Sequence, residues 1–168
     1  MDRWYLIATE PQRERYAGAE LGQQGFGIYL PLVLEAVRRG RRTSWDRRPL
    51  FPGYLFAWFD RADTARWSAI FRTKGCVAPV RIAGALAALT DAQYRGLRGL
   101  EAPDGVIRLD DAPPRARLTP GETVRVTSGP WAGFLGEVLS VKSAERVRLL
   151  LGALEIEMAS RMVDRVTS

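Results

Sequence analysis

The side chains that most often carry out chemistry are scarce in this sequence. Its 168 residues include no histidine and one cysteine, Cys76, so an internal disulfide and a histidine–cysteine metal site are excluded. The sequence has no paired-carboxylate motif, nucleophile elbow or phosphate-binding glycine loop. We therefore expect a protein that is not an enzyme and requires no cofactor or metal. Cys76 follows Gly75 in an apolar run, which predicts a small buried hydrophobic residue.

Basic side chains indicate a different kind of chemistry. The chain has 25 lysines and arginines against 19 aspartates and glutamates, a net charge of +6, and its only lysines are Lys74 and Lys142. This balance favours a polyanionic partner, most often nucleic acid, although the charge could simply keep the protein in solution. No apolar run approaches the roughly 20 residues of a membrane span, and WYLIAT near the N-terminus lacks the features of a signal peptide. We expect a cytoplasmic monomer with no membrane partner.

Aromatic side chains are concentrated in RRPLFPGYLFAWFD, residues 47–60. A strand after the turn at Pro52-Gly53 has apolar side chains on both faces. One face carries Leu55, Ala57 and Phe59, and the other carries Tyr54, Phe56 and Trp58. A strand in a small two-layer domain normally has one polar face. Either another protein or the domain's own helix must therefore cover the second face.

The segment before residue 101 alternates strands and helices. We expect strands at 3–9, 26–37 with a break at Pro31, 54–59 and 77–82, and helices near 11–24, 64–72 and 91–100. Thr9 and Gln12 resemble a capping box for the first helix, and Thr90 is the expected cap of the third. The arginine-rich stretch 38–48 is expected to be a basic loop or a hairpin tip. This order predicts an antiparallel α+β sandwich close to the ferredoxin-like plan.

A change in composition separates this segment from the rest of the chain. Residues 101–120 contain four prolines and no aromatic residue. The glycine-rich segment that follows predicts five strands of a very small barrel. We expect domains at 1–101 and 118–168, joined by a proline-rich linker at 102–117.

Together these patterns resemble the NusG family of transcription elongation factors. The resemblance covers essentially the whole chain and rests on WYLIAT, PLFPGYLF, RTKGCVAPVRI and a KOW motif in GETVRVTSGPWAGFLGEVLSV. It implies an N-terminal ferredoxin-like α/β sandwich, the NGN domain, followed by a small five-stranded SH3-like β-barrel, the KOW domain. Within the family, GRRTSWDRRPLFPGYLFAWFD is more similar to the specialised paralogue RfaH than to housekeeping NusG.

The resemblance implies that the N-terminal domain binds RNA polymerase and suppresses pausing. An exposed apolar patch would bind the clamp coiled coil of the β′ subunit, with Tyr54 and Phe56 at the matching positions and Ile82 and Leu97 as neighbours. A partner helix pair would then cover the second face of the strand, and exposed aromatic patches are typical of such sites.

The resemblance also implies contact with the non-template DNA strand of the transcription bubble. The expected DNA-binding residues are Arg13, Gln24, Arg72, Thr73 and Lys74. Cationic side chains suit single-stranded DNA. Glu10 and Glu20 stand where RfaH carries basic residues, so we expect binding to the DNA backbone rather than sequence-specific readout.

For the KOW domain, the resemblance implies contact with a small-subunit ribosomal protein, with termination factor Rho, or with both. Trp131 and Phe134 occupy the loop in which the family carries exposed aromatic residues, although Trp131 equally suits a plug at the barrel end. In RfaH this domain can instead form a helical hairpin that hides the polymerase patch, whereas the intact GPWAGFLG here favours turns. The alternative function is a KOW-type RNA- or ribosome-binding protein that does not modulate polymerase.

Overall fold

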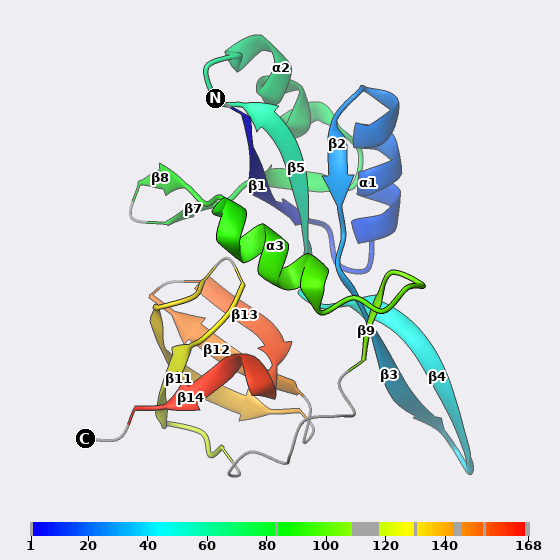
Figure 1. The fold of residues 1–168 in the computed structure, drawn as a ribbon, viewed down its shortest axis with the longest axis vertical. Helices are drawn as coiled ribbons and strands as arrows, with labels where there is room; N and C mark the ends of the chain where they lie inside the picture. Colours follow the sequence, from blue (N-terminus) through cyan, green and yellow to red (C-terminus); the bar gives the residue numbers. More distant parts are fainter. Residues whose placement is uncertain are drawn as a thin grey trace.

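The computed structural model describes residues 2–82, 84–108, 118–129, 131–142, 146–152 and 154–166. They form a mixed α/β protein (Figure 1). Its helices are α1 (Glu14–Gln23), α2 (Thr64–Ser68) and α3 (Asp91–Gly99), with 3-10 turns η1 (Ala69–Arg72) and η2 (Ser160–Met162). Its strands are β1 (Asp2–Thr9), β2 (Gly27–Tyr29), β3 (Leu32–Arg39), β4 (Arg42–Pro49), β5 (Tyr54–Asp60), β6 (Cys76–Pro79), β7 (Arg81–Ile82), β8 (Ala85–Leu86), β9 (Val106–Arg108), β10 (Thr123–Val126), β11 (Leu135–Val141), β12 (Arg146–Leu151), β13 (Leu154–Ala159) and β14 (Val163–Arg165). Within the described residues, no helix combines the length and apolar character needed to cross a membrane.

An antiparallel sheet forms the centre of the N-terminal lobe, which we define as residues 2–108. In the part of the chain that the structure describes, its strand order is β2-β5-β1-β6. The alternation along β5 separates its side chains as the sequence predicts. Leu55 packs with Ala17 and Leu21 of α1 in one buried cluster, whereas Phe56 and its cross-strand partner Leu6 belong to a second cluster on the other face.

The predicted cap of α3 is confirmed, and the predicted cap of α1 is wrong. Thr90 and Gln93 form a capping box at the start of α3: Gln93 N donates to Thr90 Oγ1 at 3.2 Å, and Thr90 N donates to Gln93 Oε1 at 2.8 Å. The capping box predicted from Thr9 and Gln12 is wrong. Thr9 is held in β1 by its pairing with Cys76, and Gln12 has a φ of +62°, so α1 begins after both.

The arginine-rich stretch, predicted as a basic loop or a hairpin tip, forms the outer part of a β-hairpin. β3 and β4 pair over their full lengths, from Leu32↔Pro49 to Arg39↔Arg42, and the turn between them is Gly40-Arg41. The hairpin projects from the body of the molecule (Figure 1). β9 pairs in parallel with the base of β3. Residues 106–108 of the predicted linker therefore belong to this sheet, and its residues 109–117 lie outside the described part of the chain.

The described residues from 118 onward form the C-terminal lobe. Its antiparallel sheet has the order β13-β12-β11-β10-β14 among the described strands. Gly136 lets β11 and β12 approach closely, because an added Cβ would lie 3.1 Å from the carbonyl oxygen of Leu150 and closer still to the side chain of Leu151. In this structure the lobe consists of strands and one 3-10 turn rather than the helical hairpin considered above.

Candidate functional site

The face of β5 that carries Tyr54 and Phe56 is covered in this structure. Phe56 is fully buried, with its ring centroid 5.9 Å from that of Tyr29 and 6.3 Å from that of Phe51. Tyr54 is half-buried. The expectation that this patch is exposed is therefore wrong for this arrangement, because residues of the N-terminal lobe and of the C-terminal lobe both lie on it.

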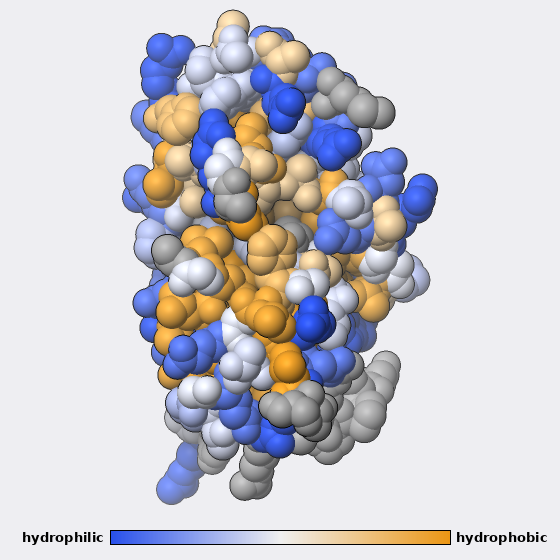
Figure 2. All heavy atoms as spheres, turned by 90° about the vertical axis from the view of Figure 1, so that its left-hand side faces the viewer, coloured by the Kyte–Doolittle hydropathy of each residue, from blue (hydrophilic) through white to orange (hydrophobic). Residues whose placement is uncertain are grey.

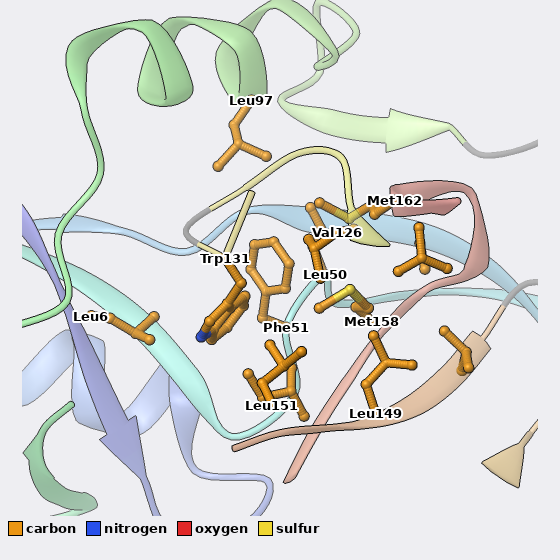
Figure 3. Close-up of a cluster of buried hydrophobic side chains, with 14 of the residues drawn as sticks. Leu6, Leu50, Phe51, Leu97, Val126, Trp131, Leu149, Leu151, Met158 and Met162 are labelled. Carbon is orange, nitrogen blue, oxygen red and sulfur yellow. The ribbon is translucent and has the colours of Figure 1, made fainter. Parts of the chain in front are cut away.

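Trp131 of the C-terminal lobe packs directly against this face. It is fully buried, and its ring centroid lies 5.1 Å from that of Phe51 and 5.7 Å from that of Tyr54, in the edge-to-face geometry that aromatic pairs prefer. Figure 3 shows Trp131 and Phe51 side by side. Gly129 permits the approach, because an added Cβ would lie 3.0 Å from Cζ of Phe51. Trp131, the residue expected to bind a partner of the C-terminal lobe, thus contacts Tyr54, the residue expected to bind polymerase.

Arg146 makes buried polar contacts between the lobes. Its buried side chain forms an ion pair with Glu35 of β3. It also donates to the carbonyl oxygens of Leu50 at 2.7 Å and Pro49 at 2.9 Å. Three acceptors thus satisfy the planar guanidinium fork, which suits arginine better than lysine to a buried contact.

A cleft of about 660 Å³ lies between α3 and the C-terminal lobe. Leu97 of α3 and Met162 of η2 are among the residues that line it. Apolar side chains gather where the lobes meet (Figure 2). Leu97 is buried, and the partly buried Ile82 packs against the same cluster as Phe56 and Tyr54. The four polymerase candidates therefore all belong to, or pack against, one apolar cluster that both lobes share.

The candidate DNA-binding residues lie at the two ends of α1 and around the end of η1: Arg13 and Gln24 flank α1, Arg72 ends η1, and Thr73 and Lys74 follow it. Gln24 Nε2 donates to Thr73 Oγ1 at 3.0 Å, and the Thr73 hydroxyl bonds the carbonyl oxygen of Ala69 at 3.0 Å. Thr73 is buried, whereas Arg72 and Lys74 are exposed. Arg72 and Lys74 are thus exposed on either side of Thr73, whose hydroxyl accepts the hydrogen bond from Gln24.

Arg13 reaches the same surface through Tyr16. The Arg13 guanidinium lies 5.4 Å from the centroid of the Tyr16 ring and 3.4 Å from the Glu10 carboxylate. Tyr16 is 39% exposed and packs beside the turn at Gly75. We did not select Tyr16 from the sequence, although its three-residue spacing from Arg13 was an available signal.

Phe134 differs from its loop neighbour Trp131. It is 43% exposed, and its backbone N–H bonds the carbonyl oxygen of Trp131 at 3.0 Å. The loop therefore carries one aromatic residue on the surface and one against the N-terminal lobe. Within the described residues, the buried Trp131 Nε1 has no hydrogen-bond partner.

Burial shifts the pKa values of two tyrosines in this region. It raises the pKa of Tyr54 above its ordinary value. Burial is also the main cause that raises the pKa of Tyr29, and the hydrogen bond that its hydroxyl donates to Glu101 at 2.8 Å adds to the shift. Much of the surface between the lobes is thus apolar and aromatic, and the Arg146–Glu35 pair adds a buried polar contact. Among the described residues, no group of three or more acidic or cysteine side chains could hold a metal ion.

Known proteins resemble this chain in sequence. The family described as "NusG: Transcription termination factor nusG" matches residues 2–98. A transcription termination/antitermination protein NusG of Thermus thermophilus is 29% identical over 153 residues, 82% of each chain. The protein of the same name from Deinococcus radiodurans is 30% identical over 168 residues, 88% of each chain. A solved structure described as "Domain interaction in Thermotoga maritima NusG" is 19% identical, with a TM-score of 0.47, covering 99% of this chain and 98% of that one.

The sequence match extends over more than half of the chain, and it includes the strands and helices that carry Tyr54 and the α1 surface. The chain belongs to the NusG family.

Proposed function

We propose that this protein is a transcription termination/antitermination factor that binds RNA polymerase. The N-terminal lobe is a ferredoxin-like NGN domain whose Tyr54 face binds the β′ clamp coiled coil and so suppresses pausing. The C-terminal lobe, residues 118–168, is an SH3-like KOW barrel. Family membership supports the general role. The contact between Tyr54 and Trp131 is the observation that supports the specific proposal, binding of polymerase through the Tyr54 face.

That contact joins two candidate binding residues from different lobes. Exposed apolar patches on proteins often mark sites where a partner binds, and covering such a patch keeps it from water when the partner is absent. Here Trp131 covers Tyr54, and each therefore hides the other. The cover is imperfect, because a buried donor without a partner, such as Trp131 Nε1 among the described residues, costs about 1–3 kcal/mol. Separation of the lobes lets water bond this N–H, which favours a reversible cover.

The surface around α1 suits the non-template DNA strand. Arg13, Arg72 and Lys74 supply positive charge, and Tyr16 adds an exposed ring on which a base can stack. Thr73 acts differently: its buried hydroxyl positions Gln24 rather than contacting DNA.

The C-terminal lobe uses Trp131 and Phe134 after the lobes separate. Both rings then lie on one loop, an arrangement that suits a protein partner such as a small-subunit ribosomal protein or Rho. The alternative, a KOW-type RNA- or ribosome-binding protein without effect on polymerase, keeps this role for Trp131 but gives Tyr54 none.

Replacement of Tyr54 distinguishes the proposed polymerase-binding factor from the alternative, a KOW-type protein that does not act on polymerase. Tyr54→Ala should weaken binding to purified core RNA polymerase about 10-fold or more, as for an aromatic anchor, in a surface-immobilised binding assay. The loss should appear even though the same change removes a contact that holds the lobes together. Phe71→Ala is the matched control, because Phe71 is a 54% exposed aromatic residue of η1. Wild-type binding by Tyr54→Ala would favour the alternative.

A further inference from the structure

The β3–β4 hairpin holds most of the net charge of the protein. Residues 38–48, RRGRRTSWDRR, contain six arginines and one aspartate, which leaves +5 compared with +6 for the whole chain. None of these residues belongs to the polymerase, single-strand or KOW-partner surfaces described above. The charge density calls for a separate explanation.

The structure presents this charge on an extended arm. Each strand has eight residues, which at about 3.4 Å per residue gives an arm about 27 Å long. β9 pairs only with Leu32–Leu34 at the base. Beyond it, within the described residues, the two strands of the hairpin have only each other as sheet neighbours. Figure 1 shows the far end of the hairpin extending away from the rest of the molecule.

Much of the positive charge on the arm is uncompensated. Arg39 forms an ion pair with Asp46 at 2.9 Å. By contrast, Arg41, Arg42 and Arg48 are exposed, and none of them forms an ion pair with any residue that the structure describes. Arg39 and Arg42 also lie directly opposite each other, where like charges destabilise a hairpin. An anionic partner removes this penalty.

We infer that the β3–β4 hairpin is a binding arm for double-stranded DNA. The major groove of B-DNA is about 12 Å wide and about 8.5 Å deep, and it admits a two-stranded β-ribbon. Arginines along such a ribbon reach the phosphates that border the groove. The major groove of duplex RNA is too deep and narrow for side chains to read. The inference goes beyond the proposed function, which assigns only single-stranded DNA, and it requires no polymerase.

A single strand fits the arm less well than a duplex. Proteins that bind single strands stack successive bases on several aromatic side chains. The arm has one large exposed ring, Trp45, which is 54% exposed. Its cross-strand partner is Ala36, and its neighbours two positions along β4 are Thr43 and Arg47. One ring without aromatic neighbours offers no stacking path, so phosphate contacts must dominate.

The test measures DNA binding by the full-length protein in the absence of polymerase. The probe is a labelled duplex of mixed sequence about two helical turns long (~20 bp), followed by fluorescence anisotropy. The triple variant Arg41→Ala, Arg42→Ala and Arg48→Ala should bind about 10-fold more weakly at about 0.1 M salt. Its dependence of log K on log salt should be shallower by about 3, close to 1 for each lost phosphate contact.

The matched control removes the same charge elsewhere. The triple variant Arg3→Ala, Arg61→Ala and Arg95→Ala replaces three exposed arginines that form no ion pair within the described residues. It should bind the duplex within about 2-fold of wild type, with an unchanged salt slope, if the arm rather than the net charge binds DNA.

Three results would overturn the inference. Equal losses in both triple variants would assign binding to net charge. A preference for the single strand, with Trp45→Ala costing more affinity than the arginine changes, would assign a stacking site. Unchanged DNA affinity together with self-association of the hairpin variant would mean that the arginines only guard the strand edges. Failure here leaves the Tyr54 proposal intact, and the reverse also holds, because the two assays share no component except the protein.

Discussion

Arg146 makes the contact between the lobes specific as well as apolar. Its ion pair with Glu35 and its bonds to the Leu50 and Pro49 carbonyl oxygens set the position of β12 against the base of the hairpin. A buried ion pair contributes little net stability, but removal of one partner is costly because the other charge remains buried. Arg146 therefore favours the arrangement in which the two lobes are packed together, as long as its contacts with Glu35, Leu50 and Pro49 are present.

Nothing local in the sequence distinguishes Arg146 from the other arginines. Glu35 lies 111 positions away, and the two carbonyl oxygens lie 96 and 97 positions away. Patterns of spacing report contacts within one element, so a contact between lobes leaves no such pattern. Tyr16 is a different case, because its partner Arg13 is three residues away.

The thiol of Cys76 should react slowly. Burial, with a further contribution from the charge of Glu10, raises its pKa from 9.0 to about 11. Since the thiolate is the reactive form, its population at pH 8 is roughly 100-fold smaller than at the ordinary pKa. Ellman's reagent should therefore label the folded protein roughly 100-fold more slowly than the urea-unfolded chain at this pH. Cys76 is only partly buried in the structure, less than the sequence predicts. Equal labelling rates would contradict the raised pKa of its thiol.

At the scale of elements, locally determined features were predictable and sheet pairing was not. The break at Pro31 and the cap at Thr90 depend on neighbours within a few residues, and both are confirmed. The cap expected at Thr9 failed because its pairing with Cys76 places it in a strand. The arginine stretch was predicted as a basic loop or a hairpin tip because charge hides the alternation that marks a strand, whereas pairing with β3 imposes the strand.

The close approach of β11 and β12 gives a prediction for one element. Gly136→Ala places a methyl group against the Leu150 carbonyl and the Leu151 side chain. It should lower the free energy of unfolding by about 1–3 kcal/mol in urea titrations, as overpacking does. Gly22→Ala is the control: Gly22 lies in α1 with open space around it, so alanine should be neutral or stabilising by about 0.5–1 kcal/mol. An unchanged free energy for Gly136→Ala would argue against this strand spacing.

At the scale of the whole molecule, the two lobes share one buried cluster. The sequence correctly predicted that the Tyr54 face requires a cover, because strand alternation leaves it apolar. It left open whether another protein or the domain's own helix supplies that cover, since both offer similar apolar chemistry, and in the structure Trp131 of the C-terminal lobe packs there. The choice depends on where the C-terminal lobe lies, and that position depends on long-range contacts such as Arg146–Glu35.

Under the proposed function, this arrangement links the binding events. Polymerase would need Tyr54 uncovered, and a partner of the C-terminal lobe would need Trp131 uncovered, yet the two rings lie 5.7 Å apart, centroid to centroid. The apparent affinity for each partner then falls with the fraction of open molecules. Any change that favours separation of the lobes should strengthen binding of both.

Polymerase affinity of Arg146→Ala tests the central claim most directly. The change leaves the Glu35 carboxylate buried without its partner, a cost of about 3–5 kcal/mol that separation of the lobes relieves. Core polymerase should therefore bind this variant about 10-fold more tightly than wild type, or by more if the open fraction is small. Arg148→Ala is the control on the same strand, because Arg148 is 43% exposed and 3.8 Å from Glu155, and its affinity should match wild type. Added Tyr54→Ala should abolish the gain of Arg146→Ala. Equal affinities for wild type and Arg146→Ala would contradict the account, because the C-terminal lobe would then not cover the polymerase-binding face.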